Sequence, residues 1–132
     1  MKYVLMMHTP RGSGEYEYHA WKPEDWEAHL AHFGRLNADL KEKGELVDIV
    51  VLTPPAQAKL VRAGSPGMPV ETDGPFPETK EFLAGYWLVD VESAERAYEI
   101  AGNASDAPGP GGAPLRMLIE VRQLMQSSPP VL

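Results

Sequence analysis

The chain has 132 residues, a formal net charge of −7, no cysteine and 43% apolar residues. This composition supports one folded domain over 1–132, with 124–132 as a loose tail, and excludes disulfides and thiolate metal sites. Without a Lys/Arg cluster, no nucleic-acid partner is expected. No apolar run approaches the roughly 18 residues of a membrane span, so we expect no membrane association and a cytoplasmic location.

The first half of the chain predicts a strand, a helix and a second strand. Residues 2–8 are apolar and β-rich. A helix is expected from Pro23, followed by acidic residues, to the turn at Gly44. Residues 45–53 form the next expected strand. The apolar stripe of the helix contains Trp26, Leu30, Phe33, Leu36 and Leu40.

The second half predicts a hairpin, a strand, a helix and a last strand. The hairpin joins 59–63 to 69–72, and 72–77 is expected to be irregular. A central strand over 84–91 precedes a helix capped by Ser93 and ending at Gly102. The stripe of this helix contains Ala94, Ala97, Tyr98 and Ala101. Alternating residues over 115–124 predict the final strand.

This order of elements predicts an α+β fold of the ferredoxin-like type. Its sheet is mostly antiparallel, and both helices cover one face. The strands over 2–8 and 84–91 carry apolar residues on both sides. Because the helices cover only one of these faces, the pattern predicts a homodimer that packs sheet against sheet.

Residues 72–92, TDGPFPETKEFLAGYWLVDVE, resemble the DGPF-motif branch of the YCII-related family. The start MKYVLMM and the late segment 119–122 resemble it as well. The resemblance implies a ferredoxin-like domain that dimerises as an α/β barrel. It also implies a His/Asp pair in a cleft, as in the YCII group, or an association with extracytoplasmic-function sigma factors, as in the DGPF branch.

Two helical histidines, His29 and His32, are the candidate catalytic residues, because imidazole is the natural general base near neutral pH. Asp73 or Asp48 is the candidate carboxylate partner. The alternative for His29 is a packing histidine with both ring nitrogens satisfied. The i,i+3 pair of histidines lacks a recognisable third ligand, so no metal and no cofactor are expected.

Other residues are candidates for a ligand site. His8 ends the first strand, Trp26 belongs to an aromatic-rich segment, and Phe76 lies in the DGPF loop. Lys80 or Arg62 is the candidate for an anionic group on a ligand. The alternative for the DGPF loop is purely structural, since Asp, Gly and Pro are typical turn residues.

Two functions follow as hypotheses. The first is a cofactor-free enzyme that performs elimination or isomerisation on a small molecule by His/Asp acid–base chemistry in a dimer cleft. The second is a non-catalytic dimeric module that binds a ligand or regulates, in connection with sigma-factor signalling.

Overall fold

The computed structural model describes residues 1–10, 21–74 and 81–126. Its main sheet has four strands in the order β2-β5-β1-β6, and every neighbouring pair is antiparallel. The strands are β1 (Lys2–Pro10), β2 (Leu46–Val51), β5 (Glu81–Asp90) and β6 (Ile119–Gln123). The long strands β1 and β5 are therefore central, and this order confirms the ferredoxin-like α+β prediction.

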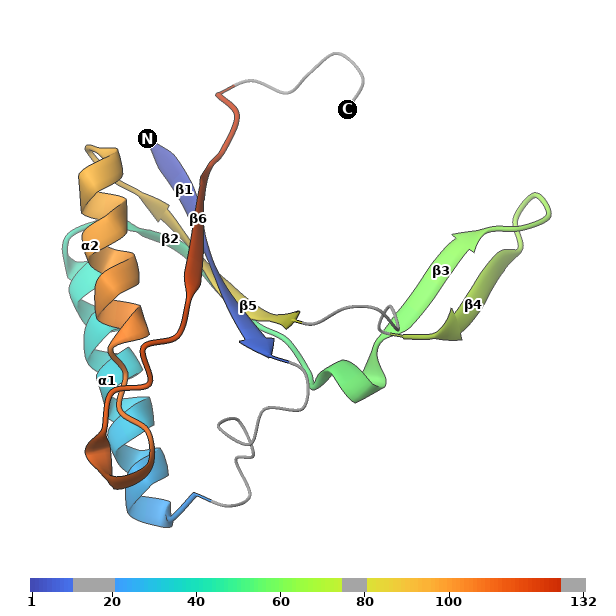
Figure 1. Cartoon of the computed structure of the whole chain (residues 1–132). Coiled ribbons are helices and arrows are strands. Elements are labelled where there is room, and N and C mark those ends of the chain that lie inside the picture. Colours follow the sequence, from blue (N-terminus) through green and yellow to red (C-terminus); the bar gives the residue numbers. More distant parts are fainter. Residues whose placement is uncertain (11–20, 75–80, 127–132) are drawn as a thin grey trace.

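The helices α1 (Pro23–Glu42) and α2 (Ala94–Ser105) lie on one face of this sheet, as Figure 1 shows. The predicted helix ends are confirmed at three points. Pro23 begins α1, Gly44 follows it with a φ of +71°, and Ser93 Oγ accepts a hydrogen bond from the Arg96 amide. A short helical turn, η4 (Pro110–Gly112), lies in the loop after α2.

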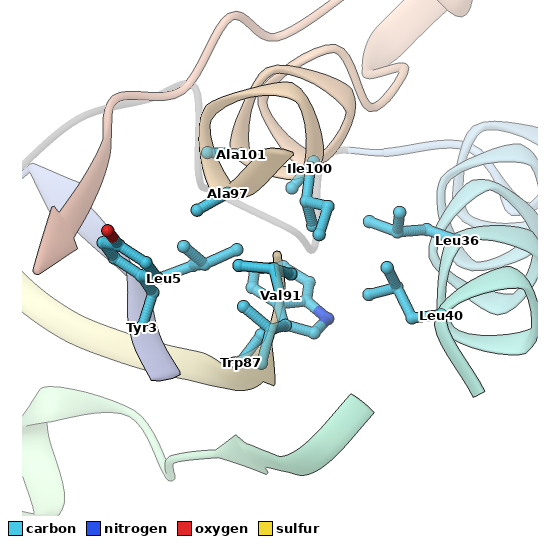
Figure 2. Close-up of a cluster of buried hydrophobic side chains, with 11 residues drawn as sticks. Tyr3, Leu5, Leu36, Leu40, Trp87, Val91, Ala97, Ile100 and Ala101 are labelled. Atoms are coloured by element: carbon cyan, nitrogen blue, oxygen red, sulfur yellow. The ribbon is translucent and has the colours of Figure 1, made fainter. Parts of the chain in front are cut away.

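The core lies between the two helices and the sheet. Leu5, Leu40, Val89 and Ile100 are almost completely buried. Figure 2 shows side chains from β1, β5, α1 and α2 converging there. Gly85 allows β2 to approach β5 closely, because a Cβ at this position would lie 2.5 Å from the Val50 carbonyl oxygen.

The predicted hairpin is present but stands apart from the main sheet. The turn η3 (Pro55–Gln57) leads into β3 (Lys59–Ala63) and β4 (Pro69–Asp73), which pair only with each other. Figure 1 shows this hairpin projecting away from the sheet and helices. Residues 72 and 73 belong to β4, so the prediction of an irregular segment from 72 was wrong there; 75–77 lie outside the described residues.

The boundaries of α2 and β6 also differ from the predictions. The helix continues past Gly102 to Ser105 because Ala101 and Ala104 are buried, which outweighs the modest helix penalty of one glycine. Tyr98, predicted in the buried stripe, is 57% exposed, and Ile100 is buried instead. The last strand begins only at Ile119, since Arg116 has a φ of +52°, which a strand does not accommodate.

The sheet face opposite the helices is apolar at its centre. The register places Val4 opposite Leu88 and Met6 opposite Tyr86, so these four side chains share that face. All four are half-buried although neither helix covers them. The two-sided apolar pattern predicted from the sequence is therefore present in the fold.

Candidate functional site

His29 lies on the side of α1 that faces the loop after α2, and only 7% of the residue is exposed. Three aromatic rings surround its imidazole edge-on. The ring centroids of Phe33, Trp21 and Trp26 lie 4.8, 5.2 and 5.7 Å away. The helical spacing of Trp26, His29 and Phe33 brings these rings together on one face of α1.

The burial and hydrogen bonding of His29 define its protonation state and its tautomer. Burial lowers the pKa of His29; the Pro108 carbonyl oxygen, 3.0 Å from Nδ1, opposes this shift, and the nearby His32 adds to it. The ring is therefore neutral at pH 7, with Nδ1 donating to the carbonyl and Nε2 carrying the lone pair. Nε2 makes no hydrogen bond to any described residue. Every fully buried polar atom of the described side chains has a hydrogen-bond partner. Nε2 is therefore not fully buried, and solvent reaches it.

His32 is occupied in another contact. Its Nε2 lies 2.7 Å from the Asn103 carbonyl oxygen near the end of α2. The two predicted catalytic histidines thus bond two different backbone carbonyls on α2 and the loop behind it. Across the described ranges, no three His, Asp or Glu side chains gather as metal ligands.

The carboxylates proposed as partners lie elsewhere in the chain. Asp73 ends β4 and pairs with Lys59 at 2.5 Å; this hydrogen bond lowers the pKa of Asp73. Asp48 lies on β2 and accepts a hydrogen bond from the Ile49 amide. Within the described chain, neither aspartate is hydrogen-bonded to either helical histidine. The hydrogen-bond partner of His29 is therefore the backbone carbonyl of Pro108 and not the predicted carboxylate.

Of the remaining predicted ligand residues, the three that the structure describes lie in different places. His8 Nε2 lies 3.1 Å from a carboxylate oxygen of Glu120, joining β1 to β6. Trp26 packs against Trp21 with 5.0 Å between ring centroids and the rings tilted by 36°. Arg62 lies on the projecting hairpin. Phe76 and Lys80 lie outside the described residues.

The structure adds a cavity that the sequence reasoning missed. It has a volume of about 320 Å³ and lies between α1 and the edge of the sheet formed by β2 and β5. Only Phe33 is shared between its wall and the surroundings of His29. The cavity is lined by Met7, Leu30, Phe33, Gly34, Asn37, Ile49, Val50, Val51, Gly85, Tyr86 and Trp87.

Gly34 leaves this cavity open on the helix side. It lies in the middle of α1, and a Cβ built there would meet no atom within 4 Å. Glycine is unfavourable inside a helix, and any larger side chain here would project into open space. The sequence signal for the cavity was the spacing of Leu30, Gly34 and Asn37, which share one face of the helix.

The fold and its sites define a small α+β protein of the ferredoxin-like class with an apolar cavity beneath its first helix. None of the helices in the described ranges is long and apolar enough to cross a membrane. The model of the YCII-related domain matches residues 1–108, so the chain belongs to this family. It is 34% identical over 100 residues to Uncharacterized protein R00369 of Rhizobium meliloti (strain 1021), covering 75% of this chain and 80% of that protein.

Proposed function

We propose that this protein binds a small, mainly apolar molecule in the cavity between α1 and the β2–β5 edge. The observation that carries the proposal is the cavity itself. Its volume of about 320 Å³ lies in the range of small-molecule sites, and such sites are typically apolar with few polar groups. The wall fits this description, since Asn37 is its only amide side chain and no lining residue is charged.

The indole of Trp87 gives a direct test. Trp87 lines the cavity, so its Nε1–H resonance in a 1H–15N spectrum should move when the cavity fills. The three indole resonances are assigned with the Trp21→Phe and Trp26→Phe variants. Titration with tetralin, a hydrocarbon of two fused rings, should shift the Trp87 resonance to saturation.

Gly34 provides matched controls for this titration. Gly34→Leu should fill the cavity and abolish the saturable shift, whereas Gly34→Ala should preserve it because only one methyl group is added. An absence of saturation in the wild type, or an equal response in Gly34→Leu, would contradict binding in this cavity.

We also propose that the protein is a homodimer joined through the open sheet face. Four half-buried apolar side chains, Val4, Met6, Tyr86 and Leu88, form the centre of this face. A second copy of the same face would remove them from water, which is the usual arrangement of a two-fold symmetric interface.

Light scattering after size-exclusion chromatography tests the dimer. The wild type should elute with twice the 14.5 kDa chain mass, and Leu88→Glu should give monomers, because a charge would be buried at the interface. Val61→Glu, on the exposed hairpin, is the control and should remain dimeric. A monomeric wild type would overturn this proposal.

A second candidate function is acid–base chemistry at His29. The observation in its favour is the neutral imidazole, whose Nδ1 is held by the Pro108 carbonyl while Nε2 keeps a lone pair within reach of solvent. This is the state that a general base requires at neutral pH. In this candidate, the carbonyl orients the ring and Nε2 accepts a proton during an elimination or isomerisation, with Asp73 as a further catalytic group contributed in the dimer.

A screen of small-molecule eliminations and isomerisations tests this candidate. Any turnover should disappear in the His29→Ala/His32→Ala double variant and persist in His8→Ala, since His8 bonds Glu120 on the sheet instead. Turnover that survives the double variant would reject His29 as the base.

The alternative without catalysis is a dimeric module that binds a ligand or regulates in connection with sigma-factor signalling. It depends on the assignment of this chain to the DGPF branch. The support for this assignment is the sequence of 73–76 and 78–81. Co-purification with an extracytoplasmic-function sigma factor would support this regulatory form, and turnover without such a partner would count against it.

A further inference from the structure

Asn37 is the polar side chain whose orientation in the cavity is fixed. Its Oδ1 accepts a hydrogen bond from Trp87 Nε1 at 2.8 Å. An indole N–H can only donate, so the amide oxygen must face Trp87 and the amide nitrogen must face away. Trp87 is 4% exposed, and Figure 2 shows its ring nitrogen on the side of α1.

Among the residues that the structure describes, the amide nitrogen of Asn37 has no hydrogen-bond acceptor, and Asn37 lines the cavity. Turning the amide over would leave the buried Trp87 Nε1 without an acceptor, which is unfavourable for a buried donor. The cavity thus offers an N–H donor in a fixed orientation, open to an acceptor on its occupant.

Charge restricts the occupant further. None of the eleven lining residues is charged. A carboxylate or ammonium group would lose part of its hydration here, and no lining residue carries a charge that would compensate for the loss. The uncharged walls therefore favour an uncharged oxygen as the acceptor.

Volume restricts its size. A cavity of about 150 Å³ accommodates benzene, and this one is about 320 Å³. The space matches two fused rings or an aliphatic group of similar volume. The aromatic walls, Phe33 and Trp87, favour a flat ring system.

We propose that the ligand of this cavity is a neutral carbonyl compound of about two fused rings, whose oxygen accepts a hydrogen bond from the Asn37 amide nitrogen. The proposal rests on the proposed binding function and specifies its ligand class.

Two probes of matched shape test it. 1-Tetralone and tetralin share the fused-ring framework, but only tetralone carries a carbonyl oxygen. Binding of each is followed by the Trp87 indole resonance in the full-length wild type. Tetralone should bind at least about fivefold more tightly than tetralin, which corresponds to one neutral hydrogen bond.

Asn37→Asp is the informative variant. The aspartate keeps an oxygen for Trp87 Nε1 but removes the N–H donor, so the tetralone preference should fall to about one or below. Because both probes experience the same altered cavity, their affinity ratio separates the lost donor from any general structural change. Gly34→Leu should abolish binding of both probes.

The outcomes separate the two proposals. Equal binding of the probes to the wild type, or a tetralone preference that survives in Asn37→Asp, would overturn the carbonyl proposal while leaving cavity binding intact. Absence of saturable binding by both probes would overturn the binding function itself.

Discussion

The two sides of helix α1 differ in how completely they are filled. On one side, His29, Leu36 and Leu40 are buried against α2, its following loop and the sheet. On the other side, Leu30 is 61% exposed and Gly34 has no atom near the position of a Cβ. The same helix therefore provides both the structural core and one wall of an open cavity.

The difference shows where this fold uses its hydrophobic residues for stability. Side chains toward α2 remove apolar area from water, whereas those toward β2 and β5 leave about 320 Å³ unfilled. Unfilled apolar space lowers stability, because the wall loses dispersion contacts. Four predictions follow, from the largest expected effect to the smallest. Those at Leu40 and Gly34 compare the two sides directly, and those at Glu45 and His29 probe the contacts of the filled side with α2 and its following loop.

Leu40→Ala should destabilise the protein most, by about 3 kcal/mol, because Leu40 is fully buried and its removal leaves a cavity. Leu30→Ala is the matched control on the other side of the helix. It should cost less than about 0.5 kcal/mol, because Leu30 is 61% exposed. Urea unfolding measures both values, and equal losses would contradict the difference between the two sides.

Glu45→Gln should cost about 1–2 kcal/mol at pH 7, because Glu45 accepts two hydrogen bonds from the Arg96 guanidinium, at 2.8 and 2.9 Å. Arg96 lowers the pKa of Glu45. This stabilisation is therefore present above the unfolded-state carboxyl pKa and is lost as the pH falls through the folded-state value.

Urea titrations at pH 7 and at pH 3 test this pair. The free energy of unfolding should fall less between the two pH values in Glu45→Gln than in the wild type. Glu99→Gln is the control, since Glu99 is 68% exposed in its side chain and contacts the same arginine. A larger loss in Glu99→Gln than in Glu45→Gln would refute the assignment.

Gly34→Ala should stabilise the protein by about 0.5–1 kcal/mol, because alanine has the higher helix propensity and its methyl group meets no atom. Gly44→Ala should do the opposite, since Gly44 has a φ of +71°. Thermal unfolding measures both, and destabilisation by Gly34→Ala would indicate that the cavity wall is already closed.

The smallest expected effect is a pH slope from His29. Because burial lowers its pKa, the unfolded state binds the proton more readily than the folded state. The stability contributed by neutral His29 is therefore present above the unfolded-state pKa of about 6.5 and declines as the pH falls below it. His29→Gln should flatten the unfolding free energy between pH 7.5 and 5.5, and an unchanged slope would show that another group titrates.

The order of elements was predictable from the sequence because its signals are local. They are the periodicity of the strands and helices and the helix start and stop residues Pro23, Gly44 and Ser93. The end of α2 was not, since Gly102 is a local stop signal whereas burial of Ala104 is a tertiary effect. The late start of β6 depends likewise on Arg116, whose left-handed backbone has no sequence signature.

The candidate site was predictable only in part. The position of His29 on the buried side of its helix follows from periodicity, but its acceptor is the carbonyl of Pro108, and backbone atoms carry no residue-type signal. Asn37 was overlooked because its importance depends on Trp87, 50 positions away in the chain. Pairings of this range require the fold itself.

The bonds from His29 to Pro108 and from His32 to Asn103 connect positions 79 and 71 residues apart. Contacts of such separation form only when both helices have docked, since the intervening chain must first be ordered. The two imidazoles therefore report the completion of folding. Their resonances should reach native positions only after the secondary structure has formed in a refolding time course.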